Sequence, residues 1–309
     1  MAGEAGFFLI VNLIAGRGRC KALLPKIKAE LDRRGFEYDL HYTNEPQEAT
    51  DVARMGIEAG YRRIVAMGGD GTINEVVNGL VGADAVLGVI PAGTGNDFVR
   101  MLGIPSDPLH ALDVFRTGSE RVMDLGRIAD DRCFVNGVGI GLDAHVARDV
   151  LQMEHLHGAT AYMVAAVKAV FRFPAFPVSI RSSDWKIDLT CLSLGIANGI
   201  YSGGGFKLAP KASIEDSLID IAAIGDFPKL ERLIRLLQAR AGKHLGLSNV
   251  HYRQLAEAEI SSNAKLVAHV DGEPYRLPRE TFTVKVVPDA LRVLVPSQDT
   301  RKPPFSSSA

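Results

Sequence analysis

Cysteine and surplus charge are both scarce in this sequence. Its 309 residues include 3 cysteines, and none of them forms a CxxC pair. That spacing argues against a disulfide scaffold or a zinc module and favours a reducing, cytoplasmic setting. Lys and Arg number 35 against 36 Asp and Glu, which gives a net charge of −1. With no basic field over the whole chain, we expect no nucleic-acid partner, and the overall charge does not argue for strong binding to anionic membranes.

Long apolar runs are also missing, so no transmembrane segment is predicted. The N-terminal run FFLIV (7–11) is too short to span a bilayer and lacks the basic flank of a signal peptide. The longest candidate, ATAYMVAAVKAVFRF (159–173), is interrupted by Lys168 and Arg172 and is predicted to be a buried amphipathic helix. Any membrane contact is therefore expected to be peripheral.

Several common catalytic motifs are absent as well. The chain has no P-loop GxxxxGK[ST], no dinucleotide-binding GxGxxG after its first strand, no HExxH and no GxSxG. Readings as a P-loop enzyme, a zinc protease or an α/β-hydrolase therefore lack support.

The first part of the chain, residues 1–125, alternates short apolar runs with longer amphipathic ones. Strands are predicted at 7–11, 36–42, 62–67 and 86–90, with helices at 21–34, 47–59 and 76–81. This alternation predicts right-handed βαβ units and therefore an α/β domain with a parallel sheet.

Beyond this point the pattern predicts a mainly antiparallel β domain over 126–289. Its strands are expected at 121–128, 132–138, 177–182, 186–197, 218–224, 256–261, 265–271 and 281–287. Helices are expected at 142–156, 159–172 and 228–241. A last strand near 290–296 is expected to return to the first domain. The polar, proline-rich segment 297–309 is expected to be a disordered tail.

Three glycine-rich loops follow predicted strands of the first domain, at 12–18, 68–72 and 91–97. Ligands gather at the carboxyl ends of parallel strands, and the helices that follow begin with free N–H groups that attract anions. The loops therefore suit a polyphosphate. A plainer interpretation is that Thr72 with Glu75, and Thr94 with Asp97, are capping boxes of these helices.

Asp70 favours the polyphosphate interpretation, although a bare carboxylate about 4 Å from a phosphate is repelled by roughly 1 to 4 kcal/mol. An aspartate in such a loop therefore indicates a specific role. It fits such a site if Mg²⁺ bridges it to the phosphates, or if it acts as a base on an attacking hydroxyl.

The motifs GGDGTINEVVNGL (68–80) and GVIPAGTGNDFVR (88–100) closely resemble the catalytic domain of the diacylglycerol kinase family. This family of lipid kinases includes sphingosine and ceramide kinases. The resemblance extends through MDLGRI (123–128), GGGFKLAPKASIEDSLIDI (203–221) and VDGE (270–273). It implies a Rossmann-like α/β domain, with a parallel sheet like that of NAD kinase and phosphofructokinase, followed by an antiparallel β-sandwich domain.

The resemblance also implies roles for particular residues. Glu273 matches the base that deprotonates the lipid hydroxyl, Asp70 matches an aspartate assigned to Mg-ATP or catalysis, and Asp124 matches a member of the catalytic network. The positions that match ATP contacts are Asn12, Leu13, Ile14, Ala15, Gly16, Thr43, Gly68, Gly69, Asp70, Gly71, Thr72, Ile73, Asn74 and Thr94.

A second, structural Mg²⁺ site is implied at the carbonyls of Ser213 and Leu218 and the carboxylate of Asp216. This chain departs from the family pattern at two points. Leu13 stands where the first loop often has proline, and Ser217 stands where the metal loop usually has glycine.

By this resemblance the protein is a kinase that uses ATP and Mg²⁺ to phosphorylate the hydroxyl of a lipid such as diacylglycerol. It would be cytoplasmic and peripheral to the membrane during catalysis, and a homodimer is an allowed assembly. The alternative is a kinase of a soluble metabolite such as NAD or a sugar phosphate, since those enzymes share the loop more loosely. A third hypothesis is a binding module that has lost catalysis, but Asp70, Asp124 and Glu273 are all present.

The segment ERLIRLLQARAGKH (231–244) is predicted to be an amphipathic helix that carries several basic residues. It either packs on the core with this basic face in solvent, or contacts anionic lipid with it.

Overall fold

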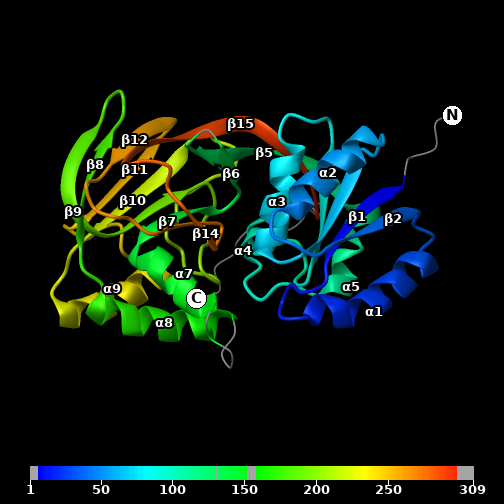
Figure 1. Ribbon diagram of the computed structural model, residues 1–309, viewed down its shortest axis with the longest axis horizontal. Helices are drawn as coiled ribbons and strands as arrows, with labels where there is room; N and C mark the ends of the chain where they lie inside the picture. Colours follow the sequence, from blue (N-terminus) through cyan, green and yellow to red (C-terminus); the bar gives the residue numbers. More distant parts are fainter. Residues whose placement is uncertain (1–5, 130, 152, 154–157, 298–309) are drawn as a thin grey trace.

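The computed structural model describes residues 6–129, 131–151, 153 and 158–297. An α/β half and a strand-rich half lie side by side, and long strands run between them (Figure 1). Nearly all of the expected tail falls in 298–309, which is outside the described residues.

The α/β half begins with four parallel strands in the order β2-β1-β3-β4. Its alternating elements are β1 (Phe7–Asn12), α1 (Arg19–Arg33), β2 (Tyr38–Thr43), α2 (Glu48–Glu58), β3 (Arg63–Gly68), α3 (Asp70–Leu80) and β4 (Val86–Pro91). Three short helices follow, which are α4 (Asp97–Met101), α5 (Pro108–Ala111) and α6 (Val114–Thr117). The predicted βαβ alternation and parallel sheet are confirmed.

Both faces of this sheet are buried, which is why its strands are almost continuously apolar. Phe8 and Ile10 of β1 pack with α2 and α3, whereas Phe7 and Leu9 pack with α1 on the opposite face. Figure 1 shows α2 and α3 on one side of the strands and α1 and α5 on the other. The carboxyl ends of β1, β3 and β4 consequently share one open edge.

The second half is antiparallel and has a core of its own, formed by side chains from the inner faces of its strands. Its strands are β5 (Ser119–Ile128), β6 (Arg132–Phe134), β7 (Gly137–Gly141), β8 (Phe176–Arg181), β9 (Lys186–Ala197), β10 (Ile219–Gly225), β11 (Val250–Leu255), β12 (Glu257–Ser261), β13 (Ala268–Val270), β14 (Glu273–Tyr275) and β15 (Thr281–Val295). The sequence missed β11 and β14, and it predicted one strand where β6 and β7 are separate.

β15 joins the two halves. Its first part pairs antiparallel with β12, its last part pairs parallel with β4, and β5 pairs with it along most of its length. An irregularity between Val287 and Leu291 bends the strand where it passes from one half to the other.

Three helices cover one side of the second half: α7 (Leu142–Leu151), α8 (Gly158–Arg172) and α9 (Lys229–Arg240). α8 buries Ala165, Ala169 and Val170 while Lys168 and Arg172 remain exposed, so the predicted amphipathic helix is confirmed. Among the described residues, no helix combines the length and the apolar character that crossing a bilayer requires.

Asp271 connects the two halves next to the open edge of the parallel sheet. Its carboxylate accepts hydrogen bonds from the backbone N–H groups of Val135, Asn136 and Gly137 at 2.8–2.9 Å, and from Asn74 Nδ2 of α3 at 2.7 Å. Burial raises the pKa of this carboxyl, and the three N–H groups oppose the shift. The turn from β13 to β14 is thereby fixed against both α3 and the chain between β6 and β7.

Replacing Asp271 by asparagine keeps the shape but places an amide N–H₂ among these donors. We expect Asp271→Asn to lower the free energy of unfolding by about 2 to 4 kcal/mol, measured by urea denaturation. Asp289→Asn is the matched control, because Asp289 is exposed and has nearly the same backbone φ, 50° against 49°. Equal stability of the two variants would contradict this role for Asp271.

Candidate functional site

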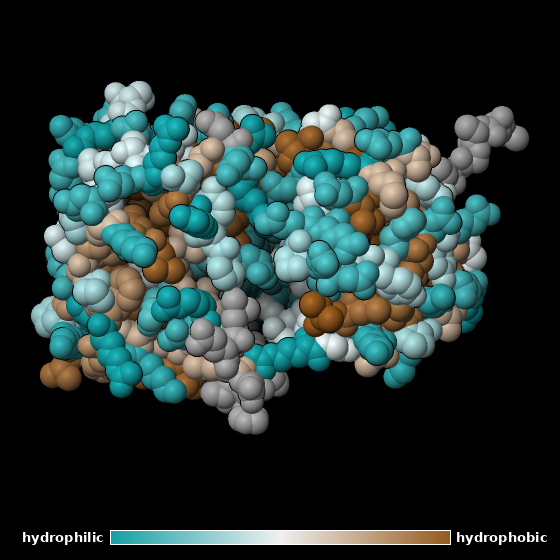
Figure 2. Space-filling view, viewed as in Figure 1, coloured by the Kyte–Doolittle hydropathy of each residue, from teal (hydrophilic) through white to brown (hydrophobic). Residues whose placement is uncertain are grey.

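The loops after β1, β3 and β4 line a cleft of about 520 Å³ that the turn 271–273 closes from the second half. Figure 2 shows the molecule hollowed between its two halves. Of the positions predicted to contact ATP, those lining this cleft are Asn12, Ile14, Ala15, Gly16, Thr43, Gly69, Asp70, Gly71, Thr72 and Thr94. Glu273 lines it as well.

The other four positions predicted to contact ATP lie behind the cleft wall. Leu13 packs against the core beneath α1, Gly68 ends β3, and Ile73 is fully buried on the opposite side of α3. Asn74 is also fully buried and accepts hydrogen bonds from Arg132, with its Nε at 3.1 Å. The side chains of Ile73 and Asn74 therefore support the loop from behind.

The capping boxes expected at these loops are wrong. α3 begins at Asp70, and its N-cap residue is Gly69, which makes no side-chain capping hydrogen bond. Thr72 therefore lies inside the helix, and its Oγ1 accepts a hydrogen bond from Asn12 Nδ2 at 3.1 Å. Glu75 instead accepts the backbone N–H groups of Gln47 at 2.9 Å and Ala49 at 3.3 Å, at the start of α2. Gly69 makes no side-chain capping hydrogen bond, so the start of α3 presents backbone N–H groups that can bind an anion in the cleft.

The second expected capping box is wrong for a similar reason. α4 has Asn96 as its uncapped N-terminal residue, and Thr94 is exposed in the cleft. The loops after β3 and β4 pack backbone against backbone, because a Cβ on Gly93 would come within 2.5 Å of Gly69 Cα. Glycine at this close approach lets both loops form one continuous wall.

Asp70 and Asp97 bring two carboxylates together in this wall. Asp70 Oδ1 accepts from the N–H of Phe98 at 3.2 Å at the start of α4. Burial, and secondly the charge of Asp97, raise the pKa of Asp70 to about 7. Burial likewise raises the pKa of Asp97, although Arg100 donates to its Oδ1 at 2.6 Å. Such a pair is costly unless a cation or a proton is shared with it.

Asp97 and Asp271 are site residues that the sequence reasoning missed. Asp97 is 5% exposed, and its Oδ2 accepts the N–H of Gly204 at 2.7 Å, which links the cleft to the second half. The signal was available, since Asp97 lies in the motif GTGNDF, where a carboxylate ends a glycine loop as Asp70 does.

Glu273 faces the start of α3 from the opposite side of the cleft. Its carboxylate lies over Gly71, so closely that a Cβ there would come within 2.6 Å of Oε1. The residue as a whole is exposed at the rim, yet burial of its carboxyl group and the nearby charge of Glu75 raise the pKa of Glu273. A carboxylate with a raised pKa at the mouth of a cleft suits a general base.

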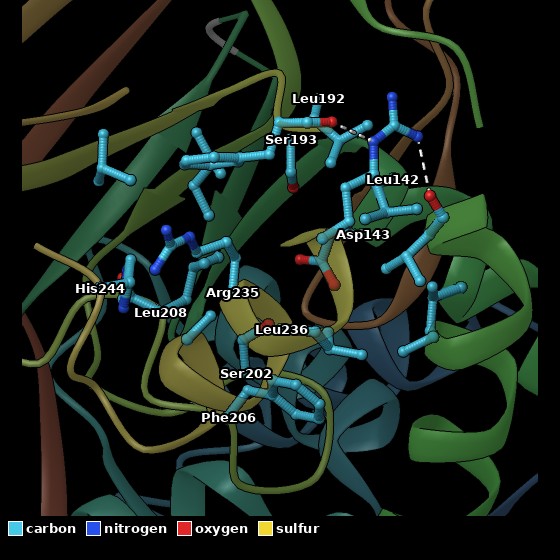
Figure 3. A pocket seen from close by; sticks show the side chains of 18 of the residues that line it. Leu142, Asp143, Leu192, Ser193, Ser202, Phe206, Leu208, Arg235, Leu236 and His244 are labelled. Carbon is cyan, nitrogen blue, oxygen red and sulfur yellow. Dashed lines mark hydrogen bonds between the residues drawn. The ribbon is translucent and has the colours of Figure 1, made fainter. Parts of the chain in front are cut away.

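Two further cavities lie next to this cleft on the side of the second half. A cavity of about 140 Å³ shares Asp70 and Asp271 with the cleft, and it reaches Tyr162 and Ser202. Tyr162 and Ser202 also line an almost wholly apolar cavity of about 80 Å³ under α8 and α9. Figure 3 shows this apolar cavity, with Leu142, Leu192 and Phe206 among its walls.

The structure places Asp124 away from these cavities. It is 2% exposed, and its carboxylate accepts the N–H groups of Ser217 at 2.7 Å and Asp289 at 2.9 Å. Asp124 therefore fixes the loop 213–218 to β15, and its role in catalysis stays a prediction.

The loop predicted to bind a second Mg²⁺ has Ser217 at the position where the family pattern usually has glycine. Ser217 has a φ of 57°, the left-handed region that glycine favours. Asp216 accepts the N–H of Leu218 at 3.1 Å, and burial followed by the charge of Asp124 raises the pKa of Asp216. Asp220 lies close by with a buried Oδ2 that has no hydrogen-bond partner, and burial raises its pKa to about 6. The excess of negative charge in this loop suits a cation.

Comparisons with known proteins match both halves. The model for the diacylglycerol kinase catalytic domain matches residues 6–128, and that for the YegS C-terminal NAD kinase beta sandwich-like domain matches 136–295. A "Probable lipid kinase YegS-like" of Chromohalobacter salexigens is 30% identical over 283 residues, which cover 89% of this chain and 90% of the relative. A "Diacylglycerol kinase" of Bacillus subtilis is 32% identical over 270 residues, which cover 86% and 88%.

Solved structures share the fold. That of a putative diacylglycerol kinase from Bacillus anthracis has a TM-score of 0.78 at 22% identity and covers 96% of this chain and 98% of its own. That of an NAD kinase from Archaeoglobus fulgidus in complex with ATP has a TM-score of 0.54 at 13% identity and covers 94% of each chain. The predicted fold class, a parallel α/β domain followed by a sandwich-like β domain, is confirmed.

The raised pKa of Asp70 predicts how this site affects stability. The folded protein keeps a proton on Asp70 that the unfolded chain releases near 3.8, so this group's contribution to stability falls as pH rises toward about 7. Asp70→Asn removes that loss. The free energy of unfolding of the variant, relative to wild type, should increase between about pH 4 and about pH 8.

Urea denaturation across this pH range measures the difference, with Asp184→Asn at an exposed position as the control. A difference between Asp70→Asn and wild type that does not change with pH would contradict the shifted pKa of Asp70.

Proposed function

The chain belongs to the diacylglycerol kinase family, and from this premise we propose that it transfers the γ-phosphate of ATP to the hydroxyl of a lipid alcohol such as diacylglycerol. One observation carries the proposal. The polar cleft that suits a polyphosphate shares Asp70 and Asp271 with a smaller cavity, and that cavity shares Tyr162 and Ser202 with an apolar cavity that suits an acyl chain.

ATP fits the cleft by size and by donor set. The uncapped start of α3 and the joined loops at Gly69 and Gly93 offer backbone N–H groups to phosphates. The NAD kinase of similar fold was solved in complex with ATP. Thr43 and Asn12, at the ends of β2 and β1, line the same cleft and complete a nucleotide-sized site.

Asp70 would hold Mg²⁺ together with phosphate oxygens. No group of three His, Cys, Asp or Glu side chains in the described part of the chain is arranged to hold a metal. Mg²⁺ in kinases takes one or two carboxylates and completes its shell with water and phosphate, so a single buried aspartate beside a second one fits this chemistry. An ion held there would supply neutralisation of the charge that develops on the transferred phosphate. We extend the proposal to a structural Mg²⁺ at Ser213, Asp216 and Leu218.

The acceptor would approach from the second half of the molecule. Its hydroxyl would lie between Glu273 and the γ-phosphate, and Glu273 would take the hydroxyl proton as the oxygen attacks phosphorus. A new O–P bond forms while the bond between the β–γ bridging oxygen and the γ-phosphorus breaks, and ADP leaves. A soluble acceptor such as NAD would leave the apolar cavity without a role, so the lipid acceptor is favoured.

The three buried free thiols, Cys20, Cys133 and Cys191, agree with a reducing compartment. We therefore place the proposed reaction at the cytoplasmic surface of a membrane.

Loss of either carboxylate should abolish most turnover without unfolding the protein. For Asp70→Asn and Glu273→Gln we expect kcat to fall by about two orders of magnitude or more, because charge neutralisation and proton transfer are each worth that much. The assay uses radiolabelled ATP, Mg²⁺ and a panel of lipids and soluble acceptors, with Glu280→Gln at an exposed position as the control. Label confined to a soluble acceptor would overturn the lipid assignment, and full activity of either variant would overturn that residue's role.

Gly71→Ala tests the position of Glu273 without touching its chemistry. The added methyl group would displace the Glu273 carboxylate. It should not destabilise the helix itself, because the helix propensity of alanine is at least as high as that of glycine. We expect turnover to fall about tenfold or more while the free energy of unfolding changes by less than about 1 kcal/mol. Gly246→Ala, where nothing lies within 4 Å of the added atom, is the matched control. Wild-type turnover in Gly71→Ala would show that catalysis does not require this position.

A further inference from the structure

Helix α9 presents an apolar face to solvent. Leu230, Ile234 and Leu237 fall on one side of the helix and are 84%, 56% and 53% exposed. In Figure 2 hydrophobic atoms reach the surface at the lower left, where Figure 1 places α9. Three large exposed side chains in one row mark a contact surface rather than scattered surface residues.

The expectation of a solvated basic face on this helix is wrong for its central arginine. Arg232 is 7% exposed, pairs with Asp226 at 2.6 Å, and donates from Nη1 to the carbonyls of Val170 at 2.8 Å and Phe173 at 3.0 Å. These carbonyls end α8 and need donors, so Arg232 is held inward. Arg235 is half-buried and pairs with Glu231 at 3.0 Å. Turning these arginines inward turns the leucine and isoleucine side chains outward.

The two helices also carry exposed cations. α8 packs beside α9 and adds Phe171, which is 37% exposed. The exposed basic residues of the two helices and the turn after α9 are Lys168, Arg172, Lys229, Arg240 and Lys243. The acidic residues on this side of α9, Asp226 and Glu231, already pair with its two inward arginines.

We propose that this α8–α9 face, formed by Leu230, Ile234, Leu237 and Phe171 with the five exposed cations of the same two helices and the turn after α9, docks on the surface of an anionic phospholipid membrane. Apolar side chains would enter the boundary between headgroups and acyl chains, and the cations would pair with phosphate groups. A second copy of the chain fits less well, because it would bring the same cations face to face.

The inward side of the same helices explains why docking belongs here. Leu236 and Ala239 of α9, with Ala166 and Val170 of α8, line the apolar cavity. This cavity shares Tyr162 and Ser202 with the neighbouring cavity that Asp70 lines. A lipid that leaves the bilayer beneath these helices would reach the cavity without crossing water. The inference rests on the proposed function for its purpose, but the docking itself is tested separately.

The test measures co-sedimentation of the whole chain with vesicles. Wild type should bind vesicles of phosphatidylcholine with an equal part of phosphatidylglycerol, and bind vesicles of phosphatidylcholine alone far less. The combined variant Leu230→Ser, Ile234→Ser, Leu237→Ser should bind the anionic vesicles about tenfold or more weakly. Lys229→Gln with Arg240→Gln should also weaken binding, by roughly fivefold or more for each charge.

The matched control is Met55→Ser with Leu109→Ser, two apolar residues exposed to 44% and 37% in the α/β half. It should bind as wild type does. Thermal unfolding and near-UV circular dichroism confirm that all variants fold. Wild-type binding by the α9 variant, or an equal loss in the control, would overturn the proposal. A wild-type dimer in sedimentation velocity that the α9 variant converts to a monomer, with vesicle binding unchanged, would show that a second copy covers this face.

Failure of the docking surface and failure of the lipid kinase proposal give different results. The α9 variant should phosphorylate a short-chain diacylglycerol dissolved as monomers at the wild-type rate, and lose about tenfold or more on long-chain diacylglycerol in anionic vesicles. Equal loss on both substrates would overturn the docking role. If wild type phosphorylates neither substrate, the proposed function fails, while the sedimentation result still decides whether the face binds a membrane.

Discussion

The geometry of the site depends on one buried carboxylate. Asp271 accepts three backbone N–H groups from residues 135–137 and the amide of Asn74 from α3, so the two halves of the molecule are fixed to each other at the cleft. Because β14 starts two residues later, the same contacts set where Glu273 lies over Gly71. Asp97 with Gly204, and Asn74 with Arg132, add further hydrogen bonds between the halves, but only Asp271 lies in the turn that carries Glu273.

The cleft also concentrates negative charge at a cost in stability. The pKa values of Asp70, Asp97, Asp271 and Glu273 are all raised, chiefly because each carboxyl group is buried. Hydrogen bonds from backbone N–H groups offset part of the pKa increase of three of these carboxyl groups, those of Asp70, Asp97 and Asp271. Such a cluster of buried carboxylates lowers the stability of the folded chain, and a ligand that carries a cation would reduce the repulsion among them. The electrostatics thus agree with a site for a metal-bound polyphosphate.

Local patterns in the sequence predicted most of the α/β half, because apolar periodicity and glycine position are properties of single segments. The order of strands and helices from β1 to β4, and the meeting of three loops at one edge, followed from them. The capping boxes failed since the start of α3 is decided by the packing of Gly69 against Gly93, a contact between separate loops. β14 was missed because its three residues become a strand only through pairing with β13.

The orientation of α9 shows a further limit of sequence patterns. Amphipathicity places basic and apolar residues on separate faces but does not say which face turns inward. Here the carbonyls at the end of α8 required donors, and Arg232 supplied them from a buried position. The apolar row was thereby left outside, directly over a cavity that is itself apolar. The helix is apolar on its outer face and lines an apolar space on its inner side. Exposure of this helix face to water is unfavourable. Contact with a bilayer surface is favourable, because the outer face of α9 would then meet acyl chains of the bilayer and its inner face would meet an acyl chain in the cavity.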